Sequence, residues 1–132
     1  MPPDPHVFFV DRSLGGKQVP GALAAHGWAI KAHDDVFPQN TPDTIWIKSV
    51  GAKGWIILTA DDNLRYNPLE KAALNASGTW TFILAPRKNL RGVEMAQAFI
   101  KAERALLKAI AKYPPSSAFR VSADGKITKC SL

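Results

Sequence analysis

Four short segments rich in apolar, β-forming residues recur along the first two thirds of the chain, at 7–10, 28–33, 55–59 and 79–84. The first and third are continuous apolar runs, which are typical of strands buried on both faces of a sheet. Between the segments, apolar residues recur at helical spacing. Strands alternating with helices predict an α/β fold, a three-layer α/β/α sandwich around a mainly parallel sheet.

Two further elements are expected after this alternating part. An amphipathic helix is predicted over 92–113, because its apolar residues repeat in steps of three and four: Met95, Phe99, Ala102, Leu106, Ile110 and Tyr113. Two short segments, 118–121 and 126–129, flank Ala123-Asp124-Gly125 and predict a terminal hairpin.

Two of the earlier helices carry start signals. Thr41-Pro42-Asp43 offers an N-cap hydroxyl, a proline at the first helical position and an acid facing the helix dipole. Asn67-Pro68-Leu69-Glu70 repeats this pattern, with Glu70 interpreted as a capping acid. The segment 34–40 is expected to be a loop, and the helix over 14–26 is expected to stop at Gly27.

Length and composition describe an ordinary globular chain. The 132 residues, 46% of them hydrophobic and 21% charged, fit a single domain spanning 1–132 and exclude a disordered or collagen-like chain. The one cysteine, Cys130, cannot form an internal disulfide, and no segment has the length or pattern of a membrane span or a signal peptide. We therefore expect a cytoplasmic protein with no membrane partner.

Charge is divided unevenly along the chain. Residues 1–86 hold seven Lys and Arg against eight Asp and Glu, whereas residues 87–132 hold ten against three, a difference of +7. Such an asymmetry is typical of a surface that binds a polyanion, although many basic proteins bind no nucleic acid. Charge alone leaves both interpretations open.

Acidic residues gather where the predicted strands end and where one helix begins. Six share this placement: Asp11, Asp34, Asp35, Asp43, Asp61 and Asp62. Right-handed crossovers bring the carboxyl ends of parallel strands to one edge of a sheet, where bare carboxylates about 4 Å apart repel by roughly 4 kcal/mol at an effective dielectric near 20. A divalent cation would offset that repulsion, and a ligand set of oxygens alone favours Mg²⁺ or Mn²⁺ over zinc.

Each acid also has a structural alternative. Asp43 suits a helix start for dipole reasons, and Asp34-Asp35 suits a solvated turn. Asp11 and Asp61 are harder to explain structurally, because an acid directly after a buried strand is desolvated unless it is paired or bound to a metal.

Other chemistries fit the sequence poorly. It has no Walker A or dinucleotide-binding glycine pattern and no Gly-x-Ser-x-Gly elbow. Cys130, in what reads as a polar tail, is a weak nucleophile candidate, and the three histidines share no metal-ligand spacing. The four tryptophans follow core periodicity, which favours packing over base stacking.

Two stretches of the sequence resemble a known family. They are Phe9-Val10-Asp11-Arg12-Ser13-Leu14-Gly15 and Leu58-Thr59-Ala60-Asp61-Asp62, with Asp34-Asp35 and the helix-start Asp43 between them. Over about residues 7–85 the chain resembles the PIN-like domain superfamily, and most closely its small stand-alone branch, which is related to VapC-type toxins and Mut7-C ribonuclease domains.

The resemblance implies a Mg²⁺- or Mn²⁺-dependent endoribonuclease, commonly the toxin of a toxin–antitoxin pair. Asp11, Asp43 and Asp61 match the acidic positions of the family and become the expected metal ligands and catalytic residues, with Asp62 as a fourth catalytic candidate. The family often has a further acid where this chain has Asn63, which leaves a second metal position open. The implied partners are an RNA substrate and a cognate antitoxin, and such toxins often form homodimers.

Five basic residues are candidates for substrate binding. Arg12 and Arg65 flank two of the acids, where each suits a substrate phosphate or an ion pair with a neighbouring acid. The polar face of the predicted long helix carries the other three, which suit an RNA backbone or a merely solvated surface: Lys101, Arg104 and Lys108.

Two other functions remain as alternatives to the nuclease. A non-catalytic RNA-binding or regulatory module on the same fold would bind RNA without metal and without Asp61. A phospho-receiver domain is the weaker alternative, because Asp11-Arg12-Ser13 lacks the second acid of an Asp-x-Asp pattern and no lysine closes a late strand.

Overall fold

The computed structural model describes residues 6–86 and 89–132 of the chain. In chain order its elements are β1 (Val7–Val10), η1 (Arg12–Leu14), α1 (Gln18–Ala25), β2 (Ala29–Ala32), α2 (His33–Val36), α3 (Asp43–Ala52), β3 (Ile56–Thr59), η2 (Asp62–Arg65), α4 (Pro68–Ala76), β4 (Thr81–Leu84), α5 (Gly92–Lys112), β5 (Ala118–Val121) and β6 (Ile127–Cys130). The extreme N-terminus, where no signal peptide is expected, and the first two residues of the basic part of the chain lie outside the described residues.

The strands form one sheet in the order β2-β1-β3-β4-β5-β6. Every neighbouring pair is parallel except β5 and β6, which form the predicted antiparallel hairpin. From β1 the chain crosses to β2 on one side and afterwards to β3 on the other, so the strand order reverses between β1 and β3. Open α/β sheets bind ligands in the crevice at the carboxyl ends of such a pair.

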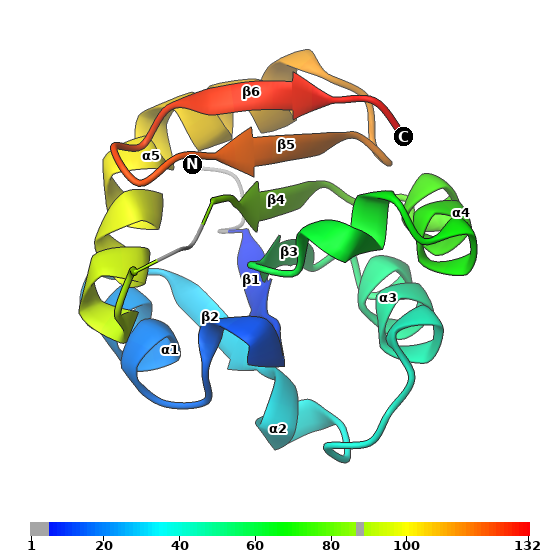
Figure 1. The fold of residues 1–132 in the computed structure, drawn as a ribbon, viewed down its shortest axis with the longest axis horizontal. Coiled ribbons are helices and arrows are strands. Elements are labelled where there is room, and N and C mark those ends of the chain that lie inside the picture. The colour runs from blue at the N-terminus through cyan, green and yellow to red at the C-terminus, as the bar shows by residue number, and fades with distance from the viewer. Residues whose placement is uncertain (1–5, 87–88) are drawn as a thin grey trace, which may run out of the picture.

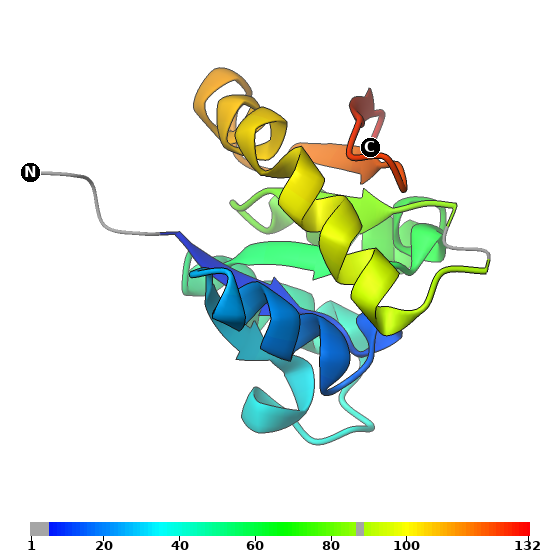
Figure 2. The ribbon, with the colours of Figure 1, turned by 90° about the vertical axis from the view of Figure 1, so that its left-hand side faces the viewer.

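Helices cover both faces of the sheet, which confirms the predicted three-layer α/β/α sandwich (Figure 1). On one face α1 and α5 lie side by side, and they are the helices nearest the viewer in Figure 2. Their buried residues, such as Leu23 and Phe99, form one core with Phe8, Leu58 and Phe82 of the strands. On the other face α3 and α4 form a smaller core.

This smaller core is largely aromatic. Trp46 of α3 is fully buried against Phe9 of β1, with ring centroids 5.1 Å apart. Leu64, between β3 and α4, and Leu74 of α4 complete it with other apolar side chains. The burial of Trp28 and Trp46 agrees with the packing role predicted for the tryptophans.

Most predicted elements are present, and four details were wrong. The helix expected over 14–26 begins only at Gln18, because Arg12–Leu14 form the separate turn η1 and Gly15 has a positive φ that interrupts a helix. The start of the expected loop 34–40 forms the single helical turn α2, which holds Asp34 and Asp35. The N-cap of α3 is Pro42, while the Thr41 hydroxyl donates to the carbonyl of Pro38, because the chain turns one residue before the helix begins. Cys130 does not lie in a polar tail: it is buried in β6, and burial raises its thiol pKa.

None of the helices among the described residues is both long enough and apolar enough to cross a membrane.

The packing of α3 against α4 depends on a glycine. A Cβ placed on Gly51, near the end of α3, would lie 2.2 Å from the carbonyl oxygen of Ser77, the residue that caps α4. Backbone atoms cannot yield as a flexible side chain can, so any larger residue at position 51 must push the two helices apart. Both helices begin at the carboxyl edge of the sheet, and this close approach therefore helps to set the spacing of their first turns.

We expect Gly51→Ala to lower the free energy of unfolding by about 1–3 kcal/mol, the range typical of overpacking. Gly21→Ala in α1 is the matched control, because its Cβ meets no atom within 4 Å, and we expect it to be neutral or to stabilise by up to about 1 kcal/mol. Urea unfolding measures both. Equal stability of the two variants would contradict the close approach of the two helices.

Candidate active site

Asp11 directly follows β1 and is almost completely buried, at 6% exposure. Its carboxylate accepts three hydrogen bonds of 2.8 Å each: Oδ1 from the backbone N–H of Arg12, and Oδ2 from the hydroxyls of Ser13 and Thr59. Hydrogen bonds to the charged form compensate the desolvation that burial imposes on a carboxylate. The protein thus holds Asp11 in one fixed orientation at the edge of the sheet.

Thr59 and Ser13 join the ends of β1 and β3. The Thr59 hydroxyl, fully buried at the end of β3, also accepts a hydrogen bond of 3.0 Å from the backbone N–H of Asp61. The Ser13 hydroxyl accepts one of 2.8 Å from the backbone N–H of Ala60. These bonds fix the position of Asp61 relative to Asp11 across the point where the strand order reverses.

Asp43 is held by the smaller, aromatic core, on the face of the sheet that α3 and α4 cover. The indole Nε1–H of the buried Trp46, one turn further along α3, donates to Asp43 Oδ1 at 2.7 Å. A buried indole needs an acceptor, and a charged acceptor makes the stronger bond. Asp43 therefore does more than face the helix dipole.

The Asp61 and Glu70 carboxyls belong to the same cluster electrostatically. Burial raises the pKa of Asp61, the backbone N–H of Asn63 opposes this, and the charges of Asp11, Asp43 and Asp62 raise it further. Burial, a hydrogen bond with the Asp43 carboxyl and the charges of Asp43, Asp61 and Asp11 raise the pKa of Glu70 to about 7.

Glu70 is the residue that sequence analysis missed, because it was interpreted only as a capping acid. The cap of α4 is made by Asn67, whose side chain accepts from the backbone N–H groups of Leu69 and Glu70. This leaves the Glu70 carboxyl free to turn towards Asp43 on α3. The sequence signal was present as an acid in a helix first turn, but only the packing of α3 on α4 brings the two carboxyls together.

The two arginines expected near the acids both form ion pairs. Arg65 Nε lies 2.6 Å from Asp62 Oδ1, and its Nη2 lies 3.3 Å from Oδ2. Arg12 Nε lies 3.1 Å from Asp34 Oδ1. The structure therefore shows the ion-pair alternative for each arginine, and the Asp34 pair draws Arg12 towards α2.

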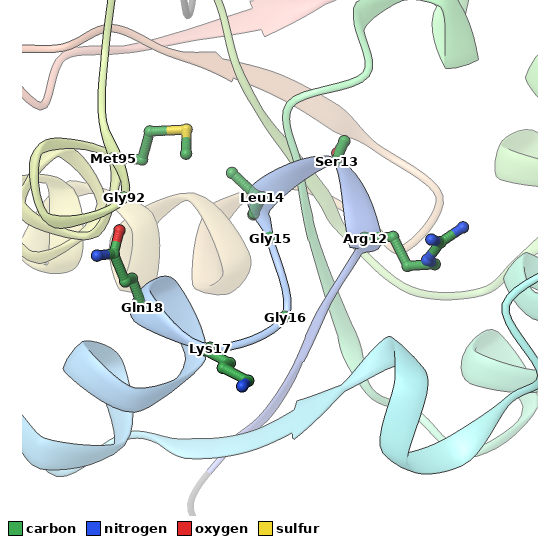
Figure 3. A pocket seen from close by; sticks show the side chains of 9 residues that line it. All are labelled: Arg12, Ser13, Leu14, Gly15, Gly16, Lys17, Gln18, Gly92 and Met95. Atoms are coloured by element: carbon green, nitrogen blue, oxygen red, sulfur yellow. The ribbon is translucent and has the colours of Figure 1, made fainter.

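A pocket of about 700 Å³ opens beside Asp11, between the start of α1 and the start of α5. Figure 3 shows Leu14 and Met95 near each other on one side of it, with the glycine loop Gly15-Gly16 running past. Its cationic lining residues, Arg12 and Lys17, project outward in this view. The three basic candidates on α5 are all exposed to solvent: Lys101, Arg104 and Lys108.

The donor chemistry of the cluster fits a hard divalent cation. Asp11, Asp43, Asp61 and Glu70 offer only carboxylate oxygens, and their mutual repulsion is of the kind that such an ion offsets. Within residues 6–86 and 89–132, no group of three or more His, Cys, Asp or Glu side chains is arranged closely enough to hold a metal ion. Asp62 is engaged by Arg65, so it lies at the margin of the cluster.

Comparison with known proteins identifies the family. The family described as PIN like domain matches residues 6–86, which include every residue of the carboxylate cluster. The chain is also 31% identical over 110 residues to "Putative ribonuclease VapC45" of Mycobacterium tuberculosis (strain ATCC 25618 / H37Rv), covering 80% of this chain and 78% of that protein. No solved structure matches the chain. The chain belongs to the PIN-like domain family.

The raised pKa of Glu70 predicts how stability depends on pH. Between its ordinary value of 4.5 and about 7, the folded protein keeps a proton that the unfolded chain has released. The contribution of Glu70 to stability is therefore fully present below this window and is lost as pH rises through it; it amounts to about 1–3 kcal/mol, since one pKa unit corresponds to about 1.4 kcal/mol and solvent screens part of the effect.

We expect Glu70→Gln to remove most of this decline in metal-free buffer, as measured by urea unfolding between about pH 4.5 and 7.5, the window that the two pKa values bracket. Asp124→Asn in the exposed β5–β6 turn is the control, because the pKa of Asp124 is lowered from its ordinary 3.8 and lies outside this window, so the variant should keep the decline of the original chain. Parallel pH profiles for the Glu70 variant and the original chain would contradict the clustering of Glu70 with the aspartates.

Proposed function

We propose that this protein is a Mg²⁺- or Mn²⁺-dependent endoribonuclease. The observation that carries the proposal is the carboxylate cluster at the reversal of strand order, where the charges of Asp11 and Asp43 raise the pKa of both Asp61 and Glu70. Membership of the PIN-like family and the likeness to a protein named a ribonuclease support it.

Each residue of the cluster has a proposed role. Asp11, Asp43 and Asp61 would hold the cation, with Glu70 and Asp62 beside them. A bound divalent ion lowers the pKa of a coordinated water and stabilises a leaving oxygen during attack on a phosphodiester. Thr59 and Ser13 keep the Asp11 carboxylate oriented.

Glu70 supplies a group that can exchange a proton at neutral pH. With its pKa at about 7, the carboxyl is partly protonated there, which is the condition under which a side chain serves best as a general acid or base. Any cation in the cluster competes with that proton, so metal binding and Glu70 protonation oppose each other.

Substrate contacts are proposed for the basic residues near the cluster and on α5. Arg12 and Arg65 would exchange part of their ion pairs for substrate phosphates. The side chains of Lys101, Arg104 and Lys108 would follow an RNA backbone away from the site.

A role as the toxin of a toxin–antitoxin pair follows from the same likeness. The matched relative carries a VapC name, and we infer a cognate antitoxin for this chain. By covering the carboxylate edge, such a partner would keep the enzyme inactive.

Metal binding gives the most direct test. We expect calorimetric titration of Mn²⁺ to show saturable binding to the original chain, and Asp61→Asn to weaken it at least tenfold and to abolish RNA cleavage. Asp124→Asn, in the exposed β5–β6 turn, is the control and should bind normally. RNA binding that persists in EDTA and in Asp61→Asn, with no cleavage by any variant, would instead identify a non-catalytic RNA-binding module.

The salt dependence of RNA binding tests whether α5 contacts the RNA backbone. We expect the affinity for single-stranded RNA to fall with salt concentration. Lys101→Glu with Lys108→Glu should reduce the slope of log K against log salt by about 0.7 for each RNA phosphate that the helix no longer neutralises. Lys48→Glu on α3, across the sheet, is the control. An unchanged slope in the double variant would show that α5 is only a solvated surface.

A further inference from the structure

Tyr66 stands out as a large aromatic side chain that the fold leaves in solvent. It is 61% exposed, whereas the other aromatic residues near the carboxyl edge, such as Phe9 and Trp46, are fully buried. It lies directly after η2 and just before Asn67, the N-cap of α4. Packing of the core does not require a tyrosine at this position.

The ring is nevertheless held in place. The guanidinium carbon of Arg65 lies 4.3 Å from the centroid of the Tyr66 ring, so Arg65 covers one face. Arg65 is itself fixed by its two contacts with Asp62, at 2.6 and 3.3 Å. Because most of the side chain is still exposed, the opposite face of the ring is open to solvent.

Tyr66 also lies within the span of chain that builds the carboxylate cluster. Asp61 caps η2 on its N-terminal side, and Glu70 lies in the first turn of α4 on its C-terminal side. Both of these acids are influenced by Asp43. The tyrosine thus lies in the chain between two acids of the cluster, with the Arg65 guanidinium against one face of its ring.

We propose that Tyr66 is a stacking platform for a nucleobase of single-stranded RNA next to the phosphodiester that is cut. Sequence-tolerant recognition of unpaired RNA uses exposed aromatic rings together with arginine planes, and the Arg65–Tyr66 pair presents both. The base would stack on the open face of Tyr66 and thereby place the adjoining phosphate over the carboxylates. This inference rests on the proposed ribonuclease function.

An apolar protein partner is the competing explanation for the exposed ring, since Ile45 and Leu69 near the starts of α3 and α4 are also exposed. The structure favours RNA, because the exposed ring is stacked on the guanidinium of Arg65. An aromatic ring beside an arginine plane is an arrangement that binds unpaired bases, whereas an apolar partner makes no use of the guanidinium.

The test measures the affinity of the full chain for two fluorescein-labelled strands of equal length, a short oligoadenylate and an abasic phosphodiester strand. Fluorescence anisotropy reports binding, in buffer that contains Ca²⁺. We expect the original chain to bind the oligoadenylate more tightly than the abasic strand. Tyr66→Ala should weaken oligoadenylate binding about 5- to 100-fold and leave abasic binding unchanged. Tyr66→Phe should retain tight binding, and Leu69→Ala, which removes an aliphatic side chain that is also largely exposed, is the matched control.

The outcomes separate this inference from the proposed function. If the original chain cleaves RNA and Tyr66→Ala binds and cleaves as well as it does, the platform is wrong and the nuclease stands. If base-dependent binding is lost in Tyr66→Ala but no variant cleaves RNA, the platform stands and the nuclease is wrong. Equal binding by all variants, with Tyr66→Ala and Leu69→Ala both changing the sedimentation of the chain from dimer to monomer, would assign the surface to a second copy and overturn the platform.

Discussion

The buried carboxylate of Asp11 is the constraint around which this protein is arranged. A charge this close to the core is tolerated only because three donors surround it, and two of them, Ser13 and Thr59, also hold the backbone at the end of β3. The bonds that stabilise the charge are thus the bonds that align two central strands. The hydrogen bonds that the buried Asp11 carboxylate requires therefore also fix the geometry of this edge of the sheet.

The repulsion between the acids of that edge is reduced in a different way at each acid. Asp62 and Asp34 are neutralised by arginines, Asp43 receives an indole N–H, and Glu70 keeps a proton. The negative charge that has no such partner lies between the ends of β1 and β3. Four of the ten basic residues in the C-terminal part of the chain lie on α5, on the other face of the sheet from α3 and α4, so a polyanion can be attracted there without neutralising the cluster itself.

Sequence patterns were informative wherever the signal is local. The apolar runs located β1 and β3, and the acids predicted to follow them, Asp11 and Asp61, do lie at the carboxyl ends of these strands. The position of Glu70 could not be predicted, because it depends on how closely α3 approaches α4 at Gly51. Asn63, where the family often has an acid, had left a second metal position open, and Glu70 brings a further carboxyl to the cluster from another element.

The hydrogen bond from Trp46 to Asp43 has a spectroscopic consequence. An indole whose N–H is bonded to a carboxylate changes its emission when the charge of that carboxylate changes, and Trp46 is fully shielded from water by the aromatic core. The protein thus contains a natural optical probe, linked directly to one proposed ligand. Changes in charge at the edge are reported from inside the hydrophobic layer, without any label.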